Sequence, residues 1–116
     1  MTPHNINILV VDDDALVRRS MCEVLSYEGY FCTQACDGED ALKKLRHLHF
    51  DILISDMKMP KIEGMELLKK VKSEFPALSV IMVTGFGSIE SAVAAIREGA
   101  VDYITKPIID DEIKLV

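Results

Sequence analysis

Acidic side chains follow the first apolar segment of the chain directly. The segment ILVV at residues 8–11 runs into three consecutive aspartates, Asp12, Asp13 and Asp14. One of them has an ordinary explanation, because a carboxylate at a helix start accepts hydrogen bonds from free backbone N–H groups. We assign that capping role to Asp14. Adjacent carboxylates repel one another, so Asp12 and Asp13 need a further reason for being there.

Further candidate site residues follow the later apolar segments. They are Asp56 after DILIS, Thr84 and Gly85 after LSVIMV, and Lys106 and Pro107 after VDYIT. Oxygen ligands on a short loop suit Mg²⁺, which takes one or two carboxylates and keeps several waters. A metal ion, a lysine and a hydroxyl group around a carboxylate make a phosphoryl-transfer site. The residues alone therefore favour phosphoryl chemistry, with a structural cation or a solvated acidic rim as the alternatives.

The segments that carry these residues alternate between strand-like and helix-like patterns. Short β-branched apolar runs predict strands at 6–11, 30–35, 51–55, 78–83 and 101–105. Amphipathic spacing predicts helices at 15–28, 38–48, 64–74, 88–98 and from 110 onward. This alternation predicts an α/β fold, a doubly wound five-stranded parallel sheet flanked by five helices, the last of them truncated. Right-handed crossovers bring the carboxyl ends of all strands to one edge, where the polar residues should meet.

Composition limits the classes of protein to consider. The chain has 116 residues, 49% of them hydrophobic, which predicts one globular domain. No apolar run approaches the roughly 18–20 residues of a membrane span, and the start shows no signal-peptide pattern. The net charge is −6, and an acidic domain repels the phosphates of nucleic acid. We expect a cytoplasmic domain with no membrane contact and no direct nucleic-acid binding.

The chain has three cysteines, Cys22, Cys32 and Cys36. An odd number without a CxxC pair suits a reducing compartment better than a disulfide framework. We therefore expect small, buried or half-buried thiol side chains that form no disulfide.

Four stretches resemble the receiver domain of bacterial two-component response regulators, the CheY-like family. They are VVDDD at 10–14, DMKMPKIEG at 56–64, VTG at 83–85 and DYITKP at 102–107, in this order and each at a predicted strand end. The resemblance covers essentially the whole chain and implies a flavodoxin-like fold, with 1–116 as a single receiver domain taken from a longer regulator. The stretch from 83 to 107 also resembles receivers of enhancer-binding transcription activators.

The resemblance implies a phosphoryl-transfer role for each matching residue. Asp56 matches the phosphoacceptor, whose carboxylate attacks the phosphorus of a phosphohistidine. Mg²⁺ would be held by Asp12, Asp13 and Asp56 together with the backbone carbonyl of Lys58. Lys106 matches the lysine that pairs with Asp56 and then with the phosphoryl oxygens.

Further roles follow from the same resemblance. The hydroxyl of Thr84 would hydrogen-bond the phosphoryl group, and the backbone N–H groups of Met57 and Gly85 would complete its binding site. Tyr103 would turn inward when Thr84 shifts. Pro107 matches a position where the peptide bond after the lysine is cis.

The resemblance also implies partners. A sensor histidine kinase or a phosphotransfer protein would donate the phosphoryl group, and an output domain or downstream protein would receive the signal. The family often dimerises through its fourth helix, fifth strand and fifth helix. The domain would be a switch that assists its own phosphorylation and dephosphorylation, rather than an enzyme.

Three other functions are considered. An aspartyl-nucleophile phosphohydrolase needs a DxDxT pattern, and Leu16 stands at the position of the threonine. A flavin-binding module needs a phosphate loop rich in Ser, Thr or Gly after the first strand, where three acids would instead repel phosphate. An inactive receiver would usually have lost one of the acids or the lysine.

Overall fold

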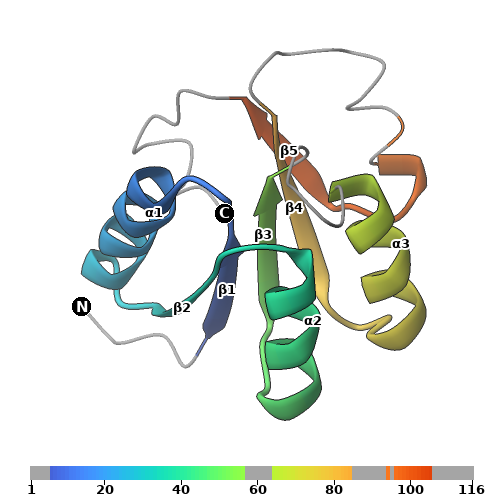
Figure 1. The fold of residues 1–116 in the computed structure, drawn as a ribbon, viewed down its shortest axis with the longest axis horizontal. Coiled ribbons are helices and arrows are strands. Elements are labelled where there is room, and N and C mark those ends of the chain that lie inside the picture. The colour runs from blue at the N-terminus through green and yellow to red at the C-terminus, as the bar shows by residue number, and fades with distance from the viewer. Residues whose placement is uncertain (1–5, 57–63, 85–93, 95, 106–116) are drawn as a thin grey trace.

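The computed structural model describes residues 6–56, 64–84, 94 and 96–105. Within these ranges three helices flank a five-stranded parallel sheet (Figure 1). The elements are β1 (Asn7–Val11), α1 (Ala15–Tyr27), β2 (Phe31–Ala35), α2 (Gly38–His47), β3 (Ile52–Asp56), α3 (Gly64–Glu74), β4 (Ser79–Thr84) and β5 (Asp102–Thr105). The helix expected at 88–98 lies mostly outside the described residues, and the helix expected from 110 lies entirely outside them. Among the described helices, none has the length and apolarity that crossing a membrane requires.

The strands are arranged in the order β2-β1-β3-β4-β5, and all neighbouring pairs are parallel. This is the flavodoxin-like order, so the predicted α/β class is confirmed. The chain moves outward from β1 to β2 and then crosses back to β3. The order therefore reverses between β1 and β3, and ligands of such sheets bind outside the carboxyl ends of the strands at this point.

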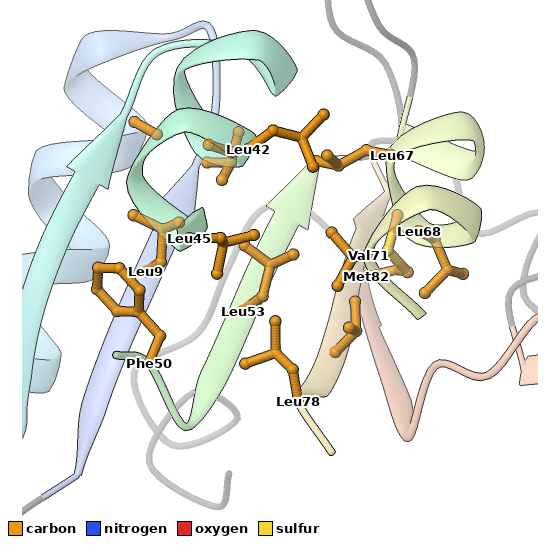
Figure 2. Packing of buried hydrophobic residues seen from close by; sticks show 14 of the residues in the cluster. Leu9, Leu42, Leu45, Phe50, Leu53, Leu67, Leu68, Val71, Leu78 and Met82 are labelled. Carbon is orange, nitrogen blue, oxygen red and sulfur yellow. The ribbon is translucent and has the colours of Figure 1, made fainter. Parts of the chain in front are cut away.

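Both faces of the sheet are covered, which explains the continuous apolar runs. Side chains of β1 alternate between two clusters: Leu9 and Val11 pack on the side of α2 and α3, and Ile8 and Val10 pack on the side of α1. Figure 2 shows the first cluster, in which leucines of α2 and α3 meet the side chain of Leu53 from β3. A strand that is buried on both faces is apolar at nearly every position.

Aspartates begin two of the helices, as the sequence predicts. The carboxylate of Asp14 accepts hydrogen bonds from the N–H groups of Leu16 and Val17, 2.9 and 3.3 Å away. Asp37 caps α2 by accepting from the N–H of Asp40 at 2.8 Å. The predicted N-cap role of Asp14 is therefore confirmed.

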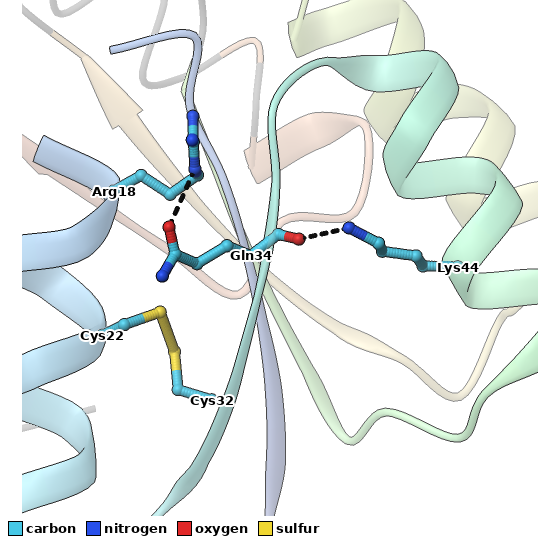
Figure 3. Close-up of a disulfide and its surroundings, with 5 residues drawn as sticks. All are labelled: Arg18, Cys22, Cys32, Gln34 and Lys44. Carbon is cyan, nitrogen blue, oxygen red and sulfur yellow. Dashed lines mark hydrogen bonds between the residues drawn. A yellow bond between two sulfur atoms is a disulfide. The ribbon is translucent and has the colours of Figure 1, made fainter. Parts of the chain in front are cut away.

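The cysteines differ from the prediction. Cys22 of α1 and Cys32 of β2 form a disulfide, with their Cα atoms 5.6 Å apart (Figure 3). The expectation of three unpaired thiols was wrong because it considered spacing along the chain, whereas the pairing depends on how α1 packs on β2. Cys36 is free and exposed. The expected burial holds for Cys22, which is buried, and for Cys32, which is half-buried, but it is wrong for the exposed Cys36.

Candidate functional site

Three carboxylates meet at the carboxyl edge of the sheet, where the strand order reverses. One oxygen from each of Asp12, Asp13 and Asp56 lies within 4.8 Å of the others. Asp12 is 0% exposed and Asp56 is 7% exposed, whereas Asp13 is exposed. We refer to these three residues as the acidic cluster.

The backbone around Asp12 is fixed from several directions. Its N–H donates to the carbonyl oxygen of Ala35 at the end of β2 over 3.3 Å. Its carboxylate oxygen Oδ1 accepts the N–H of Asp14 at 2.9 Å, and its carbonyl oxygen accepts from Nη1 of Arg18 at 2.8 Å. The first two acids of the DDD run thus stand on a loop that is tied to β2 and to α1.

Asp56 reaches the same place from β3, whose last residue it is. It pairs with Val83 of β4, and its carbonyl oxygen accepts from the hydroxyl of the buried Ser55 at 3.1 Å. Because β1 and β3 are neighbours in the sheet, residues at or directly after their carboxyl ends come close together without any long connection.

The composition of the acidic cluster fits a hard divalent cation. Carboxylates at this separation repel one another, and burial removes the water that would screen them. A set of oxygen donors alone, on a short loop and a strand end, suits Mg²⁺ rather than softer metals. The three residues can therefore hold a magnesium ion.

A polar network that sequence reasoning missed adjoins the acidic cluster (Figure 3). Nε of Arg18 donates to the side-chain oxygen of Gln34 at 3.0 Å, and Nζ of Lys44 donates to the Gln34 carbonyl. Lys44 also pairs with Asp40 at 3.1 Å. Burial raises the pKa of Asp40, but hydrogen bonds from Lys44 and from the N–H of Cys36 together hold it below its ordinary value. The network joins α1, β2 and α2. Local sequence patterns do not predict that these three elements are in contact.

The sequence of residues 8–116 matches the family model described as the response regulator receiver domain. The chain belongs to the response regulator receiver family. Receiver domains are phosphoacceptor switches of two-component signalling that bind Mg²⁺ at an acidic pocket, and in this chain Asp12, Asp13 and Asp56 are grouped at the carboxyl edge of the sheet.

Relatives and solved structures agree with this assignment. The receiver is 38% identical to the DNA-binding transcriptional regulator NtrC of Proteus hauseri over 95% of this chain and 24% of the relative. It is also 38% identical to the transcriptional regulatory protein ZraR of Escherichia coli, over 98% of this chain and 26% of the relative. A CheY-like receiver structure from Methanospirillum hungatei superposes with a TM-score of 0.90 at 35% identity, covering 97% of this chain and 90% of the other. The chain spans about a quarter of the length of the curated relatives that it matches.

Among the other predicted site residues, the structure describes the backbone positions of Thr84 and Tyr103. Thr84 ends β4 directly after Val83, the residue that pairs with Asp56. Tyr103 of β5 pairs with Met82. The side chains of Thr84 and Tyr103 lie outside the described part of the structure. The remaining predicted residues lie outside it entirely: Met57, Lys58, Gly85, Lys106 and Pro107.

A further acid, Asp51, lies at the amino end of β3, opposite to Asp56. The backbone N–H of Asn7 donates to Asp51 at 2.9 Å, and His49 lies 3.1 Å from its other oxygen. The hydrogen bond from Asn7 lowers the pKa of Asp51 most, and the contact with His49 lowers it further below its ordinary value. Asp51 therefore has a structural role, because it ties the start of β1 to the start of β3.

Proposed function

We propose that this receiver accepts a phosphoryl group on Asp56 from a phosphohistidine of a sensor histidine kinase or a phosphotransfer protein. One observation carries the proposal: the buried carboxylate of Asp56 lies within 4.8 Å of the carboxylates of Asp12 and Asp13. A buried carboxylate without such neighbours would be a structural residue. Grouped with two others at a switch point, it is a nucleophile beside a cation site.

The reaction follows from these positions. A carboxylate oxygen of Asp56 attacks phosphorus, the bond from phosphorus to the imidazole nitrogen breaks, and that nitrogen keeps the electron pair. The product is an acyl phosphate on Asp56. Asp12, Asp13 and the backbone carbonyl of Lys58 are the proposed additional ligands for Mg²⁺. When bound, the ion lowers the repulsion between the anionic nucleophile and the anionic phosphoryl group.

Three further segments complete the proposed site. Lys106 pairs with Asp56 and then with the phosphoryl oxygens, and a cis bond to Pro107 aims its side chain. The backbone N–H groups of Met57 and Gly85 donate to the same oxygens. With these groups the domain assists both its phosphorylation and its dephosphorylation.

The signal leaves the site through Thr84 and Tyr103. We infer that the Thr84 hydroxyl moves to hydrogen-bond the phosphoryl group and that the Tyr103 ring then turns inward. The register supports this, because Thr84 follows the direct partner of Asp56 and Tyr103 lies on the next strand.

The output is proposed from the relatives. NtrC and ZraR are described as transcriptional regulators, and the receiver matches about a quarter of each. We propose that it belongs to a longer cytoplasmic regulator and controls an output domain or a downstream protein. The receiver itself contacts no nucleic acid and no membrane, and dimerisation would use the fourth helix, β5 and the fifth helix.

The acceptor is tested by labelling with acetyl phosphate and Mg²⁺. Wild type should gain one hydroxylamine-labile phosphoryl group, and Asp56→Asn should gain none. Asp51→Asn is the matched control, because it neutralises an acid at the other end of the same strand and should be labelled like wild type. Stoichiometric labelling of Asp56→Asn would refute the assignment.

A further inference from the structure

A disulfide and a hydrogen bond join α1 to β2 at successive positions (Figure 3). Cys22 is bonded to Cys32, and Nε of Arg18 donates to the side chain of Gln34 at 3.0 Å. Arg18 precedes Cys22 by one helical turn, and Gln34 follows Cys32 by two strand positions. Both contacts therefore lie on the same face of each element. We call these four residues the α1–β2 seam.

The α1–β2 seam reaches the acidic cluster through Arg18. While Nε contacts Gln34, Nη1 of the same guanidinium donates to the carbonyl oxygen of Asp12 at 2.8 Å. The donors of a guanidinium are rigidly connected, so a shift of one changes the other. A displacement of α1 along β2 therefore moves the backbone that carries Asp12 and Asp13.

In this seam β2 is held more firmly than α1. β2 pairs with β1 along its whole length, and Lys44 of α2 donates to the carbonyl of Gln34. The hydrophobic cluster beneath α1 contains side chains of no other described helix. The outer face of α1 is exposed, as Leu16 at 67% and Tyr27 at 87% show. Met21 and Leu25 still hold α1 on the sheet, so opening the disulfide loosens α1 rather than β2.

We propose that Cys22 and Cys32 form a thiol–disulfide site that controls the geometry of the acidic cluster. A low-molecular-weight disulfide oxidises the pair and a dithiol reduces it. Disulfides in a compartment that keeps thiols reduced are typically transient and serve in redox sensing, which suits the proposed cytoplasmic location. The Cα atoms are 5.6 Å apart, inside the usual range for a disulfide. The consequence for phosphorylation and the cytoplasmic location rest on the proposed function.

Oxidation starts at Cys32, because its half-buried side chain lies on an edge strand whereas Cys22 is 7% exposed. The thiolate of Cys32 attacks one sulfur of the added disulfide, whose S–S bond breaks, and one thiol leaves. The thiolate of Cys22 then attacks the sulfur of Cys32, and the second thiol leaves. Two electrons pass from the cysteines to the reagent, which is reduced to two thiols.

The first measurement counts thiols in a Cys36→Ser background, so that the exposed third cysteine forms no adducts. In this background two of the three cysteines remain. After dithiothreitol has been removed and the protein unfolded in urea, both thiols should react with a maleimide. After oxidised glutathione neither should react, and the mass should show no glutathione adduct. Adding Cys32→Ala should abolish the formation of this intramolecular bond. Two reactive thiols after oxidised glutathione would overturn the proposal.

The second measurement follows the amide of Asp14, which donates to the carboxylate of Asp12 at 2.9 Å. Reduction should speed hydrogen exchange at this amide about fivefold and leave the exchange of the β3 amides unchanged. The factor of about five is the lower end of the range found for coupling between two sites in a protein. The rate of phosphorylation by acetyl phosphate should fall by a similar factor. The Cys32→Ala variant should exchange like the reduced protein under both conditions.

The outcomes separate this inference from the proposed function. Equal exchange at Asp14 in both redox states overturns the inference, even where phosphorylation proceeds. Faster exchange after reduction, with no phosphorylation in either state, supports the redox site and refutes the phosphoacceptor assignment.

Discussion

Replacing Asp13 by asparagine should stabilise the metal-free receiver. The substitution removes one charge from a cluster whose carboxylate oxygens lie within 4.8 Å of one another, and it keeps the size of the side chain. Asp13 is the suitable member, because it is exposed and its replacement leaves no buried cavity. The two remaining acids, Asp12 and Asp56, then form a cluster that carries one negative charge fewer.

The magnitude follows from Coulomb's law. At the 4.8 Å limit of their separation, two unit charges repel by about 0.9 kcal/mol at the permittivity of water and by about 3.5 kcal/mol at an effective permittivity of about 20. Because Asp13 is exposed, the lower value applies to each of its two pairs. We expect a gain of about 1–2 kcal/mol in the free energy of unfolding, or about 4–8 °C in Tm for a chain of this length.

In Mg²⁺ the Tm of wild type should exceed that of Asp13→Asn, the reverse of their order in EDTA. An ion that binds the folded state alone stabilises it by about 2.7 kcal/mol at a hundredfold excess over its Kd. Wild type should therefore gain about 11 °C, and Asp13→Asn should gain much less because it has lost a ligand. The assay is a set of thermal melts at low ionic strength, in EDTA and in Mg²⁺.

Asp14→Asn provides the matched control. Asparagine caps a helix as well as aspartate does, and Asp14 caps α1 rather than joining the acidic cluster. This variant should keep the full response to Mg²⁺. If Asp13→Asn melts below wild type in EDTA, or responds to Mg²⁺ as strongly, then Asp13 is a structural residue and the reasoning about charge is wrong.

Two further predictions concern stability. The disulfide closes a loop with a sequence separation of 10 residues. Reducing it increases the entropy of the unfolded chain, so it should lower the free energy of unfolding by about 2.7 kcal/mol. Urea titration with and without dithiothreitol measures this change, and dithiothreitol should not alter the stability of a Cys32→Ala variant. The pKa of Asp51 is lowered in the folded state, so its contribution is present above its ordinary value of 3.8 and is lost as pH falls through the lowered pKa. The Tm difference between wild type and Asp51→Asn should consequently shrink between pH 6 and pH 3, and a constant difference would contradict this origin.

The sequence by itself determines the elements and the edge at which the chemistry occurs. Continuous apolar runs such as ILVV indicate strands that are buried on both faces, and their alternation with amphipathic segments leaves a parallel α/β sheet as the simplest arrangement. The capping role of Asp14 is also local, since a helix start and its cap lie within a few residues. Placing Asp12 and Asp56 at one edge needs only the rule that parallel strands share a direction.

Tertiary structure decides what depends on lateral packing. Whether Cys22 meets Cys32 is set by the rotation and height of α1 on β2, and no pattern of spacing along the chain reports either. The double contact of Arg18 with Gln34 and the Asp12 carbonyl has the same origin, because it needs a helix, an edge strand and a loop to converge. Local periodicity fixes which face of an element is buried, whereas the partner across that face is fixed only when the whole core packs.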